Sequence, residues 1–351
     1  MAHSAQDPGE NSVPQLTLKV MLLNAENLFL LSDQKLVDEH LTTDEHKWQK
    51  LSTSVYDNKP LYKLKELTKI IAETNPDLIL LAEVGGYESL ANFNRLFLKD
   101  QYSPALVEGN SARNIDVGYL LKKNIGFYFD LVSNKNRSIN FWYPHEREYL
   151  EATAPEKKHP GHRFSRDVAE LHLFRQNKEK PFMLFLLAHL KSRLDPDGVD
   201  HNGYERRHAE LKALLEIYQE FEQKFAGLVP IVVAGDFNGN ASKRKTDSEF
   251  LAIYQTTQLQ DVCDLAQLSD ESCITYYQVG RNSKVEGKQI DYAFLSPAAA
   301  RHLRKDTVNI YRYKDRFGAP LDPPSTLDAK GSLPSDHYPL VFLLENIPII
   351  D

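Results

Sequence analysis

Several features that often decide the class of a protein are missing from this chain of 351 residues. It has only two cysteines, Cys263 and Cys273, which excludes a multi-disulfide scaffold and a cysteine-rich zinc site. The two could form one bridge or stay as thiols, which is the commoner state in a reducing compartment. The longest apolar run, Phe182 to Ala188, is far shorter than the ~20 residues that a membrane-spanning helix needs. We therefore expect no transmembrane segment.

An excess of positive charge is also missing. The chain has 42 Lys+Arg against 49 Asp+Glu, a formal net charge of -7. Such a chain has no overall attraction for polyanions, so any nucleic-acid binding has to come from a local basic surface. The hydrophobic content of 42% and the charged content of 26% are ordinary for a globular protein and exclude a disordered, collagen-like or coiled-coil chain.

No linker, repeat or shift in composition divides the chain, so we predict one domain over residues 15–351. Residues 1–14 are polar and lack the apolar stretch of a signal peptide, and we interpret them as a disordered leader or a remnant of cloning. The expected localisation is cytoplasmic, or exported if a native signal peptide is missing from this chain. We expect a monomer with no obligate protein partner.

Strand and helix signals alternate along the chain. The expected helices are Leu61–Glu73, Tyr87–Lys99 and Tyr204–Phe225, and residues 140–162 and 315–333 are expected to be loops. The expected strands are Leu16–Leu23, Asp77–Ala82, Val117–Lys122 paired with Phe127–Val132, Val168–Phe174, Phe182–Ala188, Ile231–Ala234, Ile274–Tyr277, Gln289–Leu295 and Leu340–Leu344.

Polar side chains stand where these apolar strands end. Each has a simple structural explanation, such as a turn residue or a histidine that only packs in the core. A carboxylate next to a buried strand is nevertheless costly unless it is paired or bound to a metal ion. Together the strand ends predict an acidic metal-binding pocket that holds two histidines. These polar residues are Asn24, Glu26, Glu83, His189, Asp236, Asn238, Asp336 and His337.

The motifs around these residues resemble those of the endonuclease/exonuclease/phosphatase superfamily, which includes deoxyribonuclease I, abasic-site endonucleases, sphingomyelinases and inositol polyphosphate 5-phosphatases. The resemblance runs from about residue 17 to 346 and implies a four-layer α/β/β/α sandwich. In that fold two mixed sheets pack face to face with helices outside. The motifs, in order, are LNAENLF (23–29), PDLILLAEV (76–84), HLKS (189–192), GDFN (235–238), IDYAFLS (290–296) and SDHYPL (335–340).

The resemblance implies hydrolysis of a phosphate ester with the help of Mg²⁺ or Mn²⁺. It implies that Glu83 holds the metal ion with Asn24 nearby, and that Asp336 is a further carboxylate of the metal shell. Glu26 lies two residues after Asn24, would share its face of a strand, and is therefore expected to be an extra ligand. Mg²⁺ prefers one or two carboxylates together with water and substrate phosphate, which agrees with so small a set.

The resemblance also assigns the groups that act on the substrate. Asp236 resembles the residue that orients or deprotonates the attacking water, and Asn238 would hold water or a phosphate oxygen. His337 matches the histidine that contacts the scissile phosphate, and Asp291 is expected to accept its other ring N–H. This pairing would fix the tautomer and favour the imidazolium form.

The remaining site residues follow from the deoxyribonuclease I branch of the superfamily. His189 matches the second histidine of that branch, and Asp116 is expected to orient it. Arg166 resembles an arginine that faces the substrate phosphate. Lys191 and Ser192 could also contact a phosphate, or they could be ordinary solvated polar residues.

Three functions compete on these grounds. The first, which we favour, is a metal-dependent nuclease that acts on DNA or RNA, with Lys243-Arg244-Lys245 as a basic rim of the site. The second is a phosphatase or a phospholipase C-like enzyme, for which Phe141-Trp142-Tyr143 could contact a lipid surface. The third is a relative that only binds, but a competent residue at every catalytic-type position argues against it.

Overall fold

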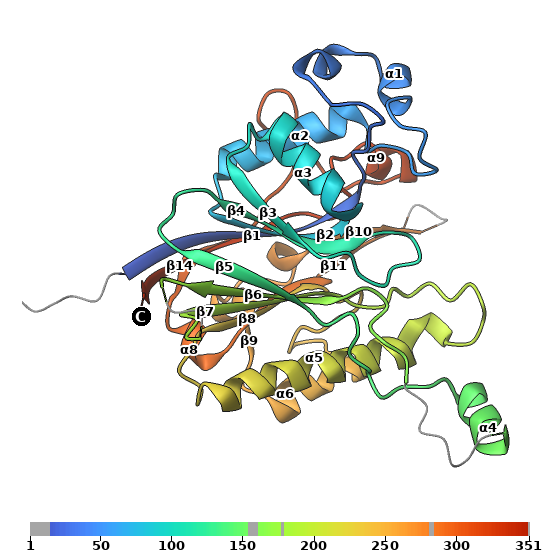
Figure 1. Cartoon of the computed structure of the whole chain (residues 1–351), viewed down its shortest axis with the longest axis vertical. Coiled ribbons are helices and arrows are strands. Elements are labelled where there is room, and N and C mark those ends of the chain that lie inside the picture. Colours follow the sequence, from blue (N-terminus) through green and yellow to red (C-terminus); the bar gives the residue numbers. More distant parts are fainter. Residues whose placement is uncertain (1–14, 154–160, 177–178, 281–283, 350–351) are drawn as a thin grey trace, which may run out of the picture.

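The computed structural model describes residues 15–153, 161–176, 179–280 and 284–349. Two six-stranded sheets face each other in the middle of the molecule (Figure 1). In strand order, the first sheet contains β13 (Leu303–Ile310), β14 (Leu340–Pro348), β1 (Gln15–Leu28), β2 (Leu78–Val84), β4 (Asp116–Lys122) and β3 (Tyr102–Leu106). The second contains β5 (Tyr128–Ser133), β6 (Val168–Phe174), β7 (Met183–His189), β8 (Ile231–Asp236), β12 (Asp291–Leu295) and β9 (Gln260–Asp261).

Helices cover the outer face of each sheet, as Figure 1 shows. The long helices α2 (Leu61–Thr74) and α3 (Gly86–Phe97) lie on the first sheet, and α5 (Tyr204–Lys224) lies with α6 (Leu251–Thr256) on the second. This arrangement confirms the predicted four-layer α/β/β/α sandwich. The shorter helices are α1 (Glu45–Gln49), α4 (Pro144–Thr153), α7 (Val262–Leu265), α8 (Pro297–Ala300) and α9 (Leu327–Gly331), and β10 (Tyr276–Val279) and β11 (Val285–Lys288) form a separate hairpin.

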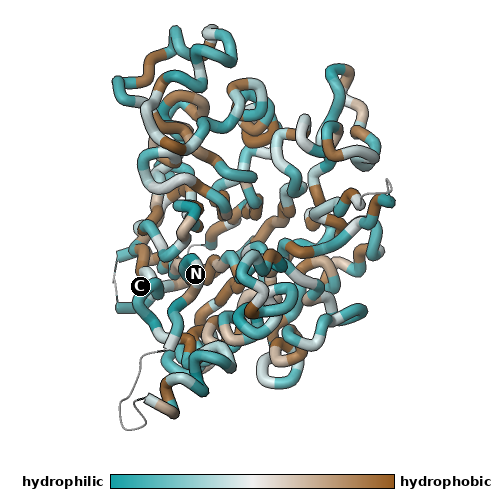
Figure 2. The backbone as a smooth tube through the Cα atoms, turned by 90° about the vertical axis from the view of Figure 1, so that its right-hand side faces the viewer, coloured by the Kyte–Doolittle hydropathy of each residue, from teal (hydrophilic) through white to brown (hydrophobic). Residues whose placement is uncertain are grey.

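The central strands are apolar along their whole length because both of their faces are covered. Residues of both sheets, such as Leu22 and Phe185, meet in one buried cluster, and a second cluster fills the layer between the second sheet and α5. The hydrophobic strands are concentrated in the interior of the molecule (Figure 2). Cys263 and Cys273 are both buried and free. None of the helices in the described ranges is long and apolar enough to cross a bilayer.

Strand direction brings the polar strand ends to one edge of the molecule. Both sheets are mixed, since β1 runs parallel to β2 and β7 runs parallel to β8, while their other pairings are antiparallel. The two parallel pairs also lie across from each other, because β8 contacts both β1 and β2. The carboxyl ends of these four strands therefore carry their polar residues into the same region.

One predicted pairing is wrong. The strands expected at 117–122 and 127–132 exist as β4 and β5, but β4 pairs with β2 and β3, whereas β5 pairs with β6 in the other sheet. The chain crosses between the sheets in a turn where Asn124 and Gly126 have φ of 63° and 86°. A short loop between two apolar runs therefore does not by itself identify a hairpin.

Most of the short or exposed elements were not expected from the sequence, and four of them show why. Helix α4 lies within the predicted loop 140–162 and buries none of its residues, so it has no apolar period. Helix α9 lies within the predicted loop 315–333 and also buries none. Strand β13 is mostly exposed, and β3 contains Pro104, which disfavours a strand. The leader predicted at residues 1–14 lies outside the described residues.

Candidate active site

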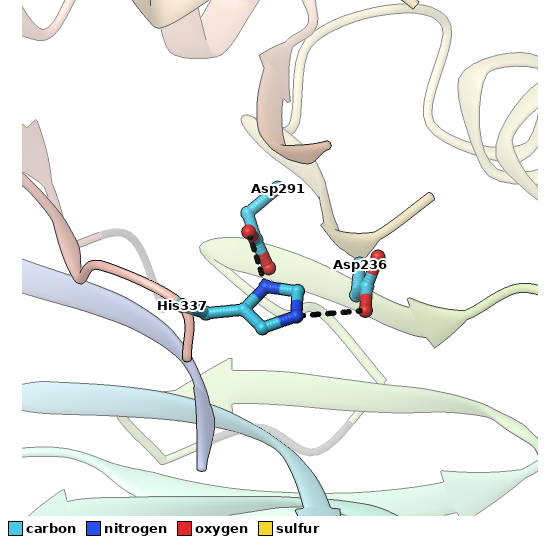
Figure 3. A group of neighbouring side chains, drawn as sticks. All are labelled: Asp236, Asp291 and His337. Atoms are coloured by element: carbon cyan, nitrogen blue, oxygen red, sulfur yellow. Dashed lines mark hydrogen bonds and ion pairs between the residues drawn. The ribbon is translucent and has the colours of Figure 1, made fainter. Parts of the chain in front are cut away.

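The centre of the site is a buried group of Asp236, Asp291 and His337 (Figure 3). Asp236 ends β8 and Asp291 begins β12, and the two are register partners on adjacent antiparallel strands. His337 precedes β14 of the opposite sheet. Its Nδ1 lies 2.8 Å from Oδ2 of Asp291, and its Nε2 lies 3.9 Å from Oδ2 of Asp236. The hydrogen bond expected between His337 and Asp291 is thus present.

The electrostatics of this group favour a charged histidine. Burial lowers the pKa of His337, but the nearby carboxylates of Asp291 and Asp336 overcome this effect and hold the pKa well above its usual value. Burial raises the pKa of Asp236 to about 7, and the charge of Asp291 adds to the increase. His337 is therefore an imidazolium that donates its Nδ1–H to Asp291.

Asp236 is held by hydrogen bonds on both of its oxygens. Its Oδ2 accepts from the side-chain amide of Asn24 at 2.9 Å, and its Oδ1 accepts from the backbone N–H of Asn238 at 2.8 Å. The preceding residue, Gly235, has a φ of 145°, and a Cβ there would lie 1.7 Å from the carbonyl oxygen of Ala188. Only glycine lets β8 approach β7 this closely, so the GDFN turn places the Asp236 carboxylate at a fixed point.

Glu83 and His189 lie on the other side of Asp236. Nε2 of His189 is 3.5 Å from Oδ2 of Asp236 and 4.0 Å from Oε1 of Glu83. Burial lowers the pKa of His189 well below its usual value, and the positive charges of Arg166 and His337 lower it further. His189 is therefore neutral at physiological pH, in contrast to His337. The structure brings together both histidines, Asp236 and Glu83, as the sequence predicts, although their chemical roles remain predictions.

Asp116 does not orient His189, contrary to the prediction. No hydrogen bond or ion pair joins these two described residues, and the buried Nδ1 of His189 has no hydrogen-bond partner in the described part of the chain. Asp116, the first residue of β4, instead accepts a 2.7 Å hydrogen bond from the backbone N–H of Gly109. The N–H of the next residue, Asn110, donates to the carbonyl of Arg166 at 3.0 Å. Asp116 therefore supports the loop that holds Arg166.

Glu26 does not lie on the strand face from which its metal role was predicted. The assumption that it shares a strand face with Asn24 fails, because Glu26 and Asn27 have φ of 49° and 54° and the pairing of β1 with β2 shifts after Asn24. The Glu26 carboxylate forms ion pairs with Lys63 at 2.7 Å and with Lys59 at 3.4 Å. Both lysines are buried, so Glu26 balances their charge, and its part as an extra metal ligand remains a prediction.

Asp336 lies on the side of His337 away from the Asp291 hydrogen bond. Its Oδ1 is 3.8 Å from Nε2 of His337, and its Oδ2 is 3.3 Å from the ammonium of Lys330. Burial raises the pKa of Asp336, but these two cations overcome this effect and lower it below its usual value. Asp336 is therefore an ionised carboxylate beside the central group, and its place in the metal shell remains a prediction.

The three residues expected to contact phosphate are not equally free to do so. Arg166 is buried, donates from Nη1 to the carbonyl of Leu190 at 3.0 Å, and has an Nε without a hydrogen-bond partner among the described residues. The ammonium of Lys191 is bound to the carbonyl oxygens of Ser192 and Leu194. The structure therefore favours Arg166 over Lys191 as a group available to a substrate, and it shows Ser192 only as an acceptor for Lys191.

A divalent cation fits the donors of this site. Oδ1 of Asp291 is buried and has no hydrogen-bond partner in the part of the chain that the structure describes. Asp236, Asp291 and His337 each offer one ligand atom, and these atoms lie within 4.8 Å of one another. A buried carboxylate oxygen without a donor is a ligand of the kind that hard cations prefer. Because Nδ1 of His337 already bonds to Asp291, the carboxylate oxygens are the better ligands for such a cation.

Several residues near the site were not singled out in the sequence, because they belong to loops and short elements without a recognisable motif. Arg113 lies 3.9 Å from Oε1 of Glu83, and the ring of Tyr276 lies 5.0 Å from the ring of His337. Lys330 belongs to α9, which was expected to be a loop. Only their position in space connects these side chains with the site.

Comparisons with known proteins support the fold. No family model matches the chain, and no curated protein matches it. Solved structures do: the human Nocturnin catalytic domain with bound sulfate has a TM-score of 0.53 and 16% identity, covering 94% of this chain and 96% of that chain. An endonuclease/exonuclease/phosphatase family protein from Bacteroides thetaiotaomicron has a TM-score of 0.51 and 14% identity, and the match covers 95% of this chain and 99% of that protein. TDP2 from D. rerio, complexed with a single-strand DNA product, has a TM-score of 0.52 and 14% identity, and the match covers 93% of this chain and 98% of that protein. This chain therefore has the same fold as these proteins, the deoxyribonuclease I-like sandwich that the sequence motifs predict.

Proposed function

We propose that this protein is a divalent-metal-dependent phosphoester hydrolase that cleaves phosphodiester bonds of DNA or RNA. The observation that carries the proposal is the buried group of Asp236, Asp291 and His337, in which a cationic histidine lies between two carboxylates. The similarity in fold to an endonuclease/exonuclease/phosphatase family protein supports the reaction class. Beside this group, the Glu83 carboxylate and the side-chain oxygen of Asn24, which also accepts from the backbone N–H of Glu26, are further oxygens for a metal ion.

The residues of the group have distinct parts in the proposed hydrolysis. Asp236, oriented by Asn24, aligns a water molecule and takes its proton. His337 keeps its Nδ1–H on Asp291 and donates from Nε2 to an oxygen of the phosphate. Arg166 offers a second positive charge to the phosphate. Glu83, Asp291 and Asn24 would hold Mg²⁺ or Mn²⁺, which neutralises phosphate charge and lowers the pKa of bound water.

A groove beside the site offers cationic side chains to a substrate. It has a volume of about 320 Å³ and continues from Ile290, the neighbour of Asp291. Four cationic residues line it, including two from the basic rim at 243–245, although acidic residues also line it and pair with Arg193 and Arg244. The cations are Arg193, Arg244, Lys245 and Lys288. Four acidic residues line the groove as well, so its formal charges balance, and Lys288 is also paired, with Glu286. A phosphodiester backbone would therefore have to compete with these carboxylates for the cations.

The alternative lipid substrate has less support. Phe141 and Tyr143, which we considered as part of a membrane contact, are both buried in the cluster under α5. Their rings pack against each other with centroids 4.9 Å apart. They are therefore core residues and do not form an exposed apolar hairpin.

The test is to incubate the purified chain and its Asp236→Asn variant with plasmid DNA, single-stranded DNA, RNA, sphingomyelin and inositol phosphates. We expect cleavage of nucleic acid in Mg²⁺ or Mn²⁺, none in excess EDTA, and none by the variant. Asp306→Asn, at an exposed ion pair with Arg304, is the matched control and should behave like the wild type. Cleavage of only the lipid or the inositol phosphates would overturn the nuclease assignment. Full activity in EDTA would overturn the metal dependence.

A further inference from the structure

Lys330 lies beside the catalytic group without belonging to any of its motifs. It belongs to α9, and its Nζ is 3.3 Å from Oδ2 of Asp336 and 3.5 Å from the centre of the Tyr276 ring. Its side chain is only 12% exposed. A carboxylate on one side and the face of an aromatic ring on the other hold the ammonium in a fixed place.

Both partners of Lys330 lead directly to His337. Oδ1 of Asp336 is 3.8 Å from Nε2 of His337, which is the nitrogen that faces away from Asp291. The ring of Tyr276 lies 5.0 Å from the imidazole, and the backbones of these two residues form an isolated antiparallel bridge. Asp336 and Tyr276 thus each contact both the Lys330 ammonium and the imidazole of His337.

Lys330 and Arg166 approach the site from different halves of the sandwich. Arg166 precedes β6 in the second sheet, whereas α9 lies on the helix-covered side of the first sheet (Figure 1). Arg166 lies among Glu83 and Asp236, and Lys330 lies at Asp336. Arg166 and Lys330 are therefore two cations that come to the acidic residues of the site from different sheets.

We propose that the ammonium of Lys330 contacts a non-bridging oxygen of the substrate phosphate, and that Asp336 and Tyr276 position it for this contact. The proposal rests on the proposed phosphoester hydrolysis and adds a residue to it. A cation fixed before the substrate arrives stabilises the negative charge of the phosphate without having to be ordered during the reaction. Charge-assisted hydrogen bonds to phosphate are also among the stronger ones in proteins.

The competing explanation is that Lys330 only fastens α9 to the loop before β14. The chain offers a matched control for this possibility in Lys314. Its ammonium also forms an ion pair with a carboxylate, Glu73, and also lies over a tyrosine ring, with 5.1 Å to the centre of Tyr311. None of these three described residues contacts the Asp236–Asp291–His337 group. Replacing Lys314 therefore removes the same kinds of contact away from the site.

The experiment compares Lys330→Met, Lys330→Gln, Lys330→Arg and Lys314→Met with the wild type. It measures the Kd of inorganic phosphate by calorimetry, kcat and KM on an oligonucleotide, and Tm. We expect both neutral variants of Lys330 to raise the phosphate Kd and the KM by roughly tenfold or more, because a charged hydrogen bond is lost. Lys330→Arg should stay within about threefold of the wild type, and Lys314→Met should lower only Tm.

Two results would overturn the proposal. In the first, the neutral variants fold, keep the phosphate Kd and the KM of the wild type, and lose as much Tm as Lys314→Met. Lys330 would then have only a structural role. The other is an arginine variant as impaired as the neutral ones. If the wild type hydrolyses none of the substrates, the proposed function fails, whereas the phosphate titration still decides the role of Lys330.

Discussion

His189 and Asp236 are register partners on the parallel strands β7 and β8, and Nε2 of the histidine lies 3.5 Å from Oδ2 of the aspartate. The same oxygen lies 3.9 Å from Nε2 of His337, which comes from the opposite sheet. One carboxylate oxygen is thus shared by two buried histidines. Burial and neighbouring cations keep His189 neutral, whereas the carboxylates near His337 keep it charged. One fold thereby places an imidazole that can accept a proton and an imidazole that can donate one beside the same carboxylate oxygen.

The first prediction concerns these two histidines. His337→Ala and His189→Ala should each lower kcat by roughly 10²–10⁴, because the first removes the donor to the phosphate and the second removes the imidazole beside the Asp236 carboxylate that takes the proton of water. Steady-state kinetics on an oligonucleotide will measure the effect. His172→Ala is the matched control, since His172 also lies beside a carboxylate, 3.1 Å from Glu170, and has no proposed role. Near-normal turnover in either site variant would remove that histidine from the mechanism.

The second prediction separates Glu83 from Glu26. Glu83→Gln should weaken Mn²⁺ binding by roughly tenfold or more, because an anionic ligand becomes a neutral amide. Glu26→Gln should leave Mn²⁺ binding unchanged and lower the free energy of unfolding by roughly 1–3 kcal/mol, because Lys59 and Lys63 lose their charged partner. Calorimetric titration with Mn²⁺ and chemical denaturation will distinguish the two. Weaker Mn²⁺ binding in Glu26→Gln would restore this residue to the metal shell.

Much of the fold could be predicted because the central strands carry strong signals. A strand such as β7 is buried along its whole length and is therefore apolar. A polar residue at its end, such as His189, is then a sign of a functional site and not of the fold. The pairing of strands was less accessible, as the false hairpin of β4 and β5 shows. A run of apolar residues indicates that a strand is buried, but it does not indicate which strand lies beside it.

The site was predictable where a motif combines with a strand end, and not where the backbone departs from regular geometry. Asp236 and His337 met as expected, since each is tied to the end of a buried strand. Glu26 failed because its positive φ breaks the alternation on which the prediction depended. Lys330 had no signal at all, because a five-residue helix that buries no residue has no pattern in the sequence.

The third prediction concerns the pH dependence of stability through Asp167. Burial raises the pKa of this carboxyl to about 7 from an ordinary value of 3.8. Between these values the folded chain keeps a proton that the unfolded chain has lost, so stability falls as pH rises and levels off above pH 7. Asp167→Asn has no such titration. Relative to the wild type, its free energy of unfolding should therefore increase by about 2–3 kcal/mol between pH 5 and pH 8.

Urea denaturation at several pH values will measure this difference, and subtraction of the wild-type curve cancels the effect of the other titrating groups. Asp306→Asn replaces an aspartate whose side chain is 69% exposed and serves as the control. A difference between Asp167→Asn and the wild type that stays constant with pH would show that the Asp167 carboxyl titrates normally.

The last prediction concerns Asp236→Asn. A water molecule that attacks phosphorus needs an acceptor for its proton, and we expect this substitution to lower kcat by about 10²-fold or more while Mn²⁺ binding through Glu83 survives. Its effect on stability is the sum of two opposing changes. Both carboxylate oxygens accept hydrogen bonds, from Asn24 and Asn238, so an amide NH₂ would face a donor. Removing a buried carboxylate beside Asp291 acts in the opposite direction, so we expect a Tm within a few degrees of the wild type.

Tm, Mn²⁺ binding and kcat should be measured on one preparation, because their combination decides between two roles for Asp236. If the carboxylate only stabilises the GDFN turn, the variant will melt at a clearly lower temperature and keep its turnover. If the carboxylate activates water, turnover will be lost while the melt and the Mn²⁺ isotherm stay close to those of the wild type. Asp315→Asn is the matched control, since Asp315 also accepts backbone hydrogen bonds within a loop, from the N–H groups of Phe317 and Ala319, and has no proposed role in the site. Equal losses of kcat in both variants would mean that loop order, and not proton transfer by Asp236, limits the reaction.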